Sequence, residues 1–251
     1  MKFPTVLIIK MGSTYRKLKS QIGDFDLWIR QSVNNQNIRW KTKSVAQVEP
    51  GKIGSYQGII LTGAHATLTQ PYEYLNGMKR VIDNIIEHEI PTLGICFGHQ
   101  VINKILGGDV ITNPLGPEIG ISRIQLTLDG IVDPLFKGLT GAKIQVYSSH
   151  VDVVSKIGNN VVSLAWNEQT QFQATKYGNF IYTVQFHPEY DKRIMEYYIR
   201  QNWNLLETGH LRNPLYISHP DEILKANKKI VKSKRMLENF VQFIFRSMLV
   251  K

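Results

Sequence analysis

The sequence predicts an α/β protein in which a mostly parallel sheet is covered by helices on both faces. Short apolar runs alternate with segments of helical periodicity through the first half of the chain, as expected when strands and helices succeed each other. Beyond residue 118 the strand-like runs alternate between apolar and polar residues and are separated by turns. We expect residues 1–202 to form the main domain and residues 203–251 to form a helical C-terminal extension.

In the first half, strands are predicted at residues 5–11, 39–48, 57–62 and 90–95, of which 39–48 is the weakest. Helices are predicted at residues 18–33, 74–88 and 97–106. The first two of these carry apolar residues three or four positions apart, which is the spacing of a buried helix face.

In the second half, strands are predicted at residues 119–128, 143–154, 161–166 and 171–186, the last with a hairpin turn at residues 177–180. Asp191 is a suitable N-cap for a helix that runs to about Asn202. After a polar loop, helical sequence extends from residue 221 to the end. Its apolar stripe must be buried on the parent domain or on another subunit, which would give a homo-oligomer. The stripe consists of Leu237, Phe240, Val241, Ile244, Phe245 and Met248.

The composition is that of an ordinary globular protein, with 251 residues, 43% of them hydrophobic and 20% charged. A single cysteine excludes an intrachain disulfide. The apolar N-terminus is interrupted by Lys10 and no small-residue cleavage site follows, so we predict a core strand there and not a signal peptide. No apolar stretch approaches the ~20 residues that span a bilayer. We therefore expect a cytoplasmic protein with no membrane partner.

The chain is basic, with a net charge of +10. Lysine and arginine gather at residues 39–43 and 225–235. No nucleic-acid-binding motif accompanies them and no aromatic residues interleave with them, so a solvated helix face is expected and a nucleic-acid partner is not. An acidic protein or a phosphorylated substrate is the alternative partner for such a surface.

The cysteine lies in the most informative segment of the chain, Gly94-Ile95-Cys96-Phe97-Gly98. This is the thiol form of a nucleophile elbow, a sharp strand-to-helix turn that exposes the nucleophile and needs small residues on either side. The turn also places the sulfur at a helix N-terminus, where unpaired amides favour the thiolate. His187 can serve as its general base and Glu189 can orient the imidazole, so the chain offers a catalytic triad.

Two segments together resemble the class I glutamine amidotransferase family, over residues 6–202. They are the cysteine segment that ends at Gln100 and the segment that contains His187-Pro188-Glu189. The segment at residues 148–152 resembles the subgroup that includes the glutaminase domain of GMP synthetases. The resemblance implies a flavodoxin-like fold. It also implies that Cys96 attacks the γ-carboxamide of glutamine or of another γ-glutamyl group.

The resemblance further implies an oxyanion hole made of the backbone amides of Ala64 and Phe97. It implies that the substrate is bound by Gly63, Gln100, Ser149 and His150, the last two through their backbone. No metal ion and no cofactor are expected, because neither a set of ligands at metal spacing nor a phosphate-binding motif occurs.

Three residues depart from the family pattern. Ala64 and His65 stand where the family has glycine and proline in the oxyanion loop, and Val151 stands where glycine is usual. If the loop needs a positive φ or a peptide flip, Ala64 opposes it by ~1 kcal/mol or more. His65 could face the pocket.

Three functions remain open from the sequence. The first is a glutaminase that releases ammonia, whose acceptor would be a separate synthetase because no ATP-binding motif is present. The second is a stand-alone γ-glutamyl peptidase that acts on glutathione-like compounds. The third is a non-catalytic binding or regulatory module, which the retention of Cys96, His187 and Glu189 disfavours.

Overall fold

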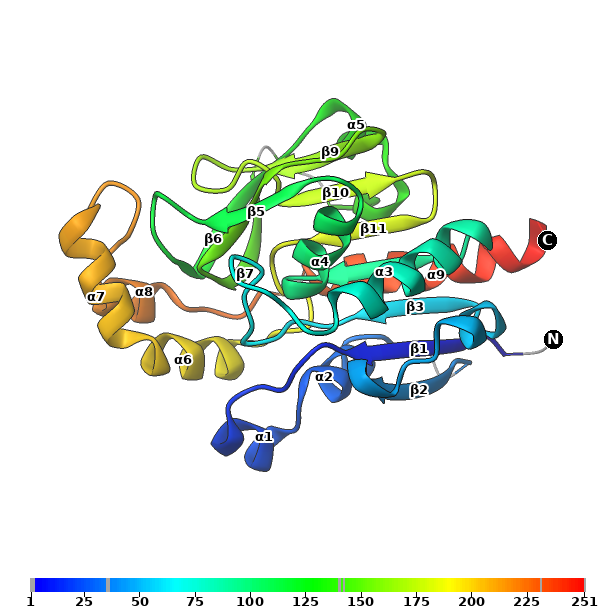
Figure 1. Ribbon diagram of the computed structural model, residues 1–251. Helices are drawn as coiled ribbons and strands as arrows, with labels where there is room; N and C mark the ends of the chain where they lie inside the picture. Colours follow the sequence, from blue (N-terminus) through cyan, green and yellow to red (C-terminus); the bar gives the residue numbers. More distant parts are fainter. Residues whose placement is uncertain (1–2, 35–36, 140, 142, 231, 251) are drawn as a thin grey trace.

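The computed structural model describes residues 3–34, 37–139, 141, 143–230 and 232–250, and its centre is a nine-stranded sheet (Figure 1). The strand order is β2-β1-β3-β4-β11-β10-β9-β6-β7, and β5 and β8 form a second, two-stranded sheet. The strands are β1 (Thr5–Lys10), β2 (Arg39–Ser44), β3 (Gly58–Leu61), β4 (Thr92–Ile95), β5 (Asp109–Thr112), β6 (Glu118–Leu126), β7 (Ile144–His150), β8 (Asp152–Lys156), β9 (Val161–Trp166), β10 (Ala174–Tyr177) and β11 (Ile181–Val184).

The large sheet is parallel from β2 to β11 and antiparallel from β11 to β7. The parallel part is the doubly wound, flavodoxin-like arrangement that was predicted, and the prediction of the fold class is confirmed. The predicted hairpin joins β10 to β11 through residues 178–180, with Gly178 at φ 56°.

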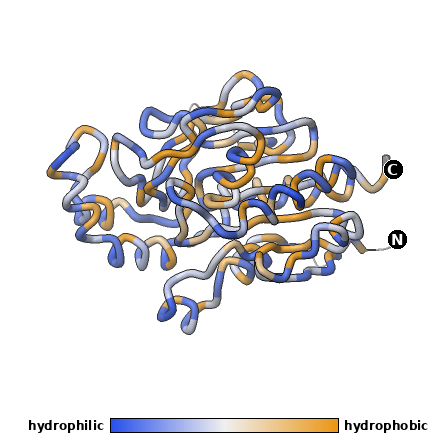
Figure 2. The backbone as a smooth tube through the Cα atoms, viewed as in Figure 1, coloured by the Kyte–Doolittle hydropathy of each residue, from blue (hydrophilic) through white to orange (hydrophobic). Residues whose placement is uncertain are grey.

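Helices cover both faces of the parallel part because the side chains of its buried strands alternate between two cores. Leu7 and Ile9 of β1 contact the core under α3 (Leu75–Glu87) and α4 (Phe97–Ile105). Val6 and Ile8 contact the opposite core, under α2 (Phe25–Gln31) and α9 (Lys234–Val250). In Figure 2 hydrophobic colour follows the strands in the middle of the molecule.

The remaining helical elements are α1 (Arg16–Ile22), α5 (Leu128–Val132), α6 (Lys192–Gln201), α7 (Trp203–Arg212), α8 (Pro220–Ala226), and the 3₁₀ turns Val45–Gln47, Pro50–Ser55 and Pro134–Phe136.

The helix predicted at residues 18–33 is wrong in one respect, because it is two helices, α1 and α2. Gly23 has φ 84° and ends α1, and Asp24 then caps α2 by accepting from the Phe25 amide. The apolar period continues across this break, so the pattern did not reveal it. The strand predicted at 143–154 is likewise two strands, β7 and β8, which pair with β6 and β5 respectively.

The apolar stripe of the C-terminal helix is buried on the parent sheet. Leu237, Phe240, Val241 and Ile244 of α9 are at most 2% exposed and belong to the same core as Val6 of β1. The stripe is therefore covered within the chain, and a homo-oligomer through α9 stays a prediction. Within the described ranges, no helix is long and apolar enough to cross a membrane.

Candidate active site

Cys96 occupies the sharp turn between β4 and α4. Its φ of 51° and ψ of −101° are in a region that residues other than glycine rarely adopt, which marks a strained position of the kind found at functional sites. Its neighbours must be small. A Cβ on Gly94 would lie 2.7 Å from the carbonyl oxygen of Gly98, and one on Gly98 would lie 2.6 Å from that of Leu61. The two glycines therefore permit the turn that holds the thiol at the helix N-terminus.

His187 lies beside this turn and is held on three sides. Its Nδ1 is 2.7 Å from Glu189 Oε1, and its ring stacks on Tyr190 with centroids 4.0 Å apart and on Phe25 at 6.1 Å. Burial would lower the pKa of His187, but the charge of Glu189 and the charge and hydrogen bond of Cys96 raise it to about 10. With so high a pKa the imidazole holds its proton at neutral pH, and the carboxylate of Glu189 balances its charge.

Three parallel strands bring these residues together. β3, β4 and β11 are adjacent, and Gly63, Cys96 and His187 follow their carboxyl ends. A Cβ on Gly63 would lie 3.0 Å from His187 Cε1 and 3.7 Å from Cys96 Cβ. The absence of a side chain at Gly63 thus allows the imidazole to approach the cysteine.

The sulfur also contacts two groups outside the predicted triad. Cys96 Sγ lies 3.8 Å from the carbonyl oxygen of Ser149, and Gln185 Nε2 donates to the sulfur at 3.7 Å. Gln100 Nε2 donates to the Asp152 carbonyl at 2.9 Å and to Gln185 Oε1 at 3.3 Å. Both Gln100 donors are therefore turned toward protein acceptors, and its side-chain oxygen is left for other contacts. The role of Gln185 was not predicted.

The amides of Ala64 and Phe97 are free to bind an anion. Phe97 is the first residue of α4, where helical amides have no acceptor within the helix, and neither amide donates to any described residue. Ala64 does not have a positive φ, so the strain considered for this position is absent. Space for its methyl group comes from Gly12, where a Cβ would lie 2.7 Å from Ala64 Cβ.

A cavity of about 550 Å³ opens in front of the sulfur. Most of the predicted site residues line it, namely Ala64, Cys96, Phe97, Gln100, Ser149, His150 and His187. Gly63 and Glu189 do not line it, and both are buried in contact with His187. The His150 side chain is buried, with Nε2 3.1 Å from Glu118 Oε2.

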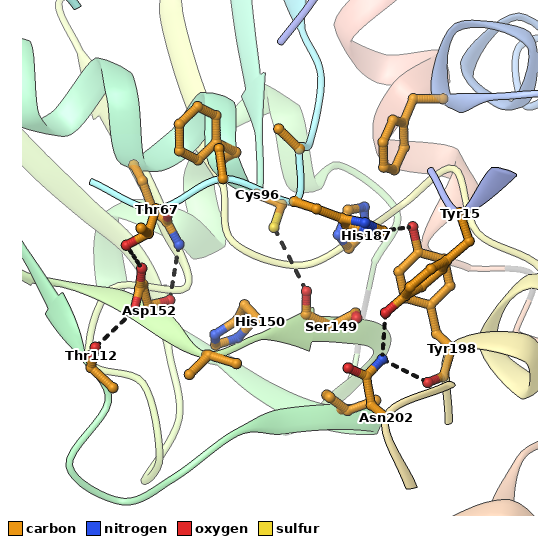
Figure 3. Close-up of a pocket in the computed structure, with 18 of the residues that line it drawn as sticks. Tyr15, Thr67, Cys96, Thr112, Ser149, His150, Asp152, His187, Tyr198 and Asn202 are labelled. Atoms are coloured by element: carbon orange, nitrogen blue, oxygen red, sulfur yellow. Dashed lines mark hydrogen bonds between the residues drawn. The ribbon is translucent and has the colours of Figure 1, made fainter. Parts of the chain in front are cut away.

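Other residues that line the cavity were missed. On one side of Cys96 lie Thr67, Thr112 and Asp152, and on the other side lie Tyr15, Tyr198 and Asn202 (Figure 3). Asp152 had a signal, because it belongs to the segment at 148–152 that carried the family resemblance. The two tyrosines had none, because they come from two distant parts of the chain. The described residues contain no group of three or more His, Cys, Asp or Glu that could hold a metal ion.

Comparisons with known proteins place this site in a family. The model of the glutamine amidotransferase class-I family matches residues 26–204. The chain is 30% identical over 234 residues to a GMP synthase [glutamine-hydrolyzing] of Clostridium novyi, covering 92% of this chain and 42% of that protein. It is 25% identical to gamma-glutamyl peptidase 5 of Arabidopsis thaliana, covering 57% of each chain. It thus spans about half the length of these curated relatives.

Solved structures support the same assignment at the level of fold. A glutamine amidotransferase from Thermotoga maritima superposes with a TM-score of 0.72 at 20% identity, over 97% of this chain and 99% of that one. The family model covers most of the chain, including Cys96, His187 and Glu189. The chain belongs to the class-I glutamine amidotransferase family.

Proposed function

We propose that this protein hydrolyses the γ-amide bond of glutamine or of another γ-glutamyl amine through a thioester on Cys96. One observation carries the proposal: the strained elbow holds Cys96 at the edge of the cavity, next to an imidazole that is itself fixed by Glu189 at 2.7 Å. Nucleophile, base and orienting carboxylate are the parts that covalent acyl transfer requires.

The proposed reaction has two steps. In the first, the Cys96 thiolate attacks the γ-carbonyl carbon, the C–S bond forms and the C–N bond breaks, and the protonated His187 gives its proton to the departing amine. In the second, His187 takes a proton from water, whose oxygen attacks the thioester. The C–S bond breaks, the proton returns to the Cys96–His187 pair, and the γ-carboxylic acid of glutamate is released. Glu189 holds the imidazole in position and stabilises its charge in both steps.

The negative oxygen that develops in each step would be bound by the amides of Ala64 and Phe97. Ala64 and Phe97 line the same cavity as Cys96, and their amides have no acceptor among the described residues. Donors fixed in this way before the reaction stabilise the transition state more than the substrate, and the loss of one typically costs about 3–4 kcal/mol of barrier.

The glutamyl part of the substrate would lie toward Asp152. This half-buried carboxylate accepts hydrogen bonds from Thr67 Oγ1 and, at 3.0 Å, from Thr112 Oγ1, and it faces the cavity (Figure 3). A carboxylate suits the positively charged α-amino group of a γ-glutamyl substrate. Gln100 and the backbone of Ser149 and His150 would complete this end. Gly63 would contribute space for His187 and not a substrate contact.

We further propose that residues 1–202 form the catalytic unit and that residues 203–251 are an extension which covers one face of it. The family match at residues 26–204 supports this division. The burial of Leu237 and Phe240 against the β1 side of the sheet supports the covering role.

Covalent labelling tests the function directly. The purified protein is incubated with a diazo-ketone analogue of glutamine, and the adduct is located by mass spectrometry. We expect labelling of Cys96, protection by free glutamine, and no labelling in Cys96→Ala. The same variant should not hydrolyse glutamine or γ-glutamyl peptides, and its thermal stability should be close to that of the wild type. Turnover by Cys96→Ala would refute the assignment, and kinetics on the two substrates separate a glutaminase from a peptidase.

A further inference from the structure

The cavity has two chemically different ends, with Cys96 between them (Figure 3). One end is polar and acidic, with Thr67, Thr112 and Asp152. The other is formed by Tyr15, His65, Tyr198 and Asn202 and is called here the aromatic end. None of the residues of the aromatic end takes part in the two chemical steps described above.

The rings of the aromatic end are held in fixed positions. The Tyr15 ring centroid lies 4.4 Å from that of His65 and 5.1 Å from that of Tyr198. The Tyr198 hydroxyl is 2.8 Å from Thr14 Oγ1 and 3.2 Å from His65 Nε2. Asn202 Nδ2 donates to the Tyr15 hydroxyl at 3.1 Å and to the Tyr198 carbonyl at 2.8 Å. Such preorganised rings lose little conformational freedom when a ligand binds.

The aromatic end is also accessible. Tyr198 is buried, Tyr15 and Asn202 are half-buried, and His65 is exposed. The surface therefore leads from the buried neighbourhood of His187 to solvent. Although the residue is exposed as a whole, the His65 ring is partly desolvated where it packs against Tyr15 and Tyr198. This desolvation and the charge of His187 lower the pKa of His65, which favours the uncharged ring for contact with an apolar group.

The position of His187 decides which part of a substrate meets these rings. In the proposed reaction the departing nitrogen takes its proton from His187, so the amine must lie on the His187 side of Cys96. His187 stacks on Tyr190 at 4.0 Å, and Tyr190 lies 5.1 Å from Tyr198. The substituent of the amine is therefore directed toward the aromatic end, while the α-amino group is directed toward Asp152.

We propose that the aromatic end is a leaving-group subsite that selects γ-glutamyl amides whose amine carries a flat aromatic ring. This inference rests on the proposed function, and it names the substrate class for the same site. Contact of a planar ring with the half-buried Tyr15, which the buried Tyr198 supports, supplies the selectivity, because an aromatic pair is worth more than the burial of equal apolar area. Free glutamine leaves this subsite empty.

Three synthetic amides test the proposal, γ-glutamyl phenethylamide, γ-glutamyl 2-cyclohexylethylamide and γ-glutamyl propylamide. They share the two carbons next to the nitrogen and differ in the group beyond. We expect kcat/KM for the phenethylamide to exceed that for the propylamide about tenfold and that for the cyclohexylethylamide about threefold, the range expected for one or two aromatic contacts. Equal values for the phenethylamide and the cyclohexylethylamide would overturn the selection of flat rings.

Variants locate the selectivity. Tyr15→Leu should lower the phenethylamide-to-propylamide ratio to about twofold, while Tyr15→Phe, which keeps the ring, should retain it. Tyr216→Leu removes a partly exposed tyrosine that does not line the cavity and should leave rates and ratio unchanged. An unchanged ratio in Tyr15→Leu would place the selectivity elsewhere and refute the subsite. Hydrolysis of all three amides without preference would refute only this inference, whereas hydrolysis of none, with Cys96 unlabelled, would refute the proposed function itself.

Discussion

A Cβ atom on Gly12 would lie 2.7 Å from the Cβ of Ala64, closer than real side chains approach. Gly12 follows β1 and Ala64 follows β3, so the contact joins two loops at the carboxyl edge of the sheet. The alanine in the oxyanion loop is thus accommodated by a glycine 52 positions earlier (64 − 12), and not by strain at Ala64 itself, which has no positive φ.

The first prediction concerns this contact. Gly12→Ala should push the Ala64 loop away from Cys96, lowering kcat for a γ-glutamyl amide about 10²-fold, as for the loss of an oxyanion donor. The overlap should also cost about 1–3 kcal/mol of stability. Gly77→Ala is the matched control, because a Cβ there meets no atom within 4 Å and Gly77 lies within helix α3. Steady-state kinetics and thermal unfolding should separate the two variants, and identical behaviour would contradict the prediction.

The second prediction concerns the charge on Glu189. Removing it in Glu189→Gln takes away a negative neighbour that raises the pKa of His187, so that pKa falls from about 10. The rate should drop about 10²- to 10⁴-fold because the imidazole is held less well. The decline of activity at high pH should also begin at a lower pH, since His187 loses its proton earlier.

The control for Glu189→Gln is Glu196→Gln, which changes a partly exposed carboxylate that is paired with Arg200 at 2.9 Å on α6. It should leave the pH profile of kcat unchanged. If kcat declined at the same high pH in wild type and Glu189→Gln, the carboxylate would not set the pKa of His187.

The sequence was sufficient for the parts of the site that are local in the chain. The elbow is contained in residues 94–98, and the His187–Glu189 pair spans two residues, so both could be identified from short segments. Strands β1, β3 and β4 could be predicted because they are buried, continuous apolar runs, whereas the edge strand β2 is polar and mostly exposed and gave the weakest signal. The prediction of a single helix at residues 18–33 was wrong because the spacing of the apolar residues does not reveal the conformation of Gly23.

The aromatic end could not be predicted for a different reason. His65 and Tyr198 are 133 residues apart, and Asn202 and Tyr15 are 187 apart. Their contacts arise only when α6 packs beside the loops that follow β1 and β3. No local pattern distinguishes tyrosines that line a cavity from tyrosines of an ordinary core, so such residues become visible only in the folded molecule.

The third prediction concerns stability in acid. Burial would raise the pKa of Glu118, but the imidazole of His150, 3.1 Å away, and donors such as Asn167 lower it to about 2. A carboxyl whose pKa is lower in the folded protein than in the unfolded chain stabilises the fold at every pH above its unfolded-state pKa of 4.5. This contribution is lost as the pH falls from 4.5 to about 2. The loss should amount to about 3 kcal/mol of the free energy of unfolding.

Glu118→Gln should be less stable than wild type at pH 7, but its free energy of unfolding should fall less between pH 5 and pH 3, as measured by urea midpoints. Parallel losses in the two proteins would exclude the Glu118 carboxylate as the cause.

The last prediction tests the polar end of the cavity. Asp152 faces the cavity and is held by Thr67 and Thr112, so its carboxylate is fixed where the α-amino group of a γ-glutamyl substrate would lie. Asp152→Asn should raise KM for γ-glutamyl amides about tenfold or more, with a smaller effect on kcat, because a hydrogen bond between charged groups is worth about 1.5–3 kcal/mol. The corresponding glutaric acid monoamide, which lacks only the α-amino group, should be hydrolysed equally poorly by both proteins. The exposed Asp129 on α5 supplies the control Asp129→Asn, which should behave as wild type. If Asp152→Asn affected the glutaric acid monoamide and the γ-glutamyl amide alike, Asp152 would support the shape of the cavity and would not bind the charge of the substrate.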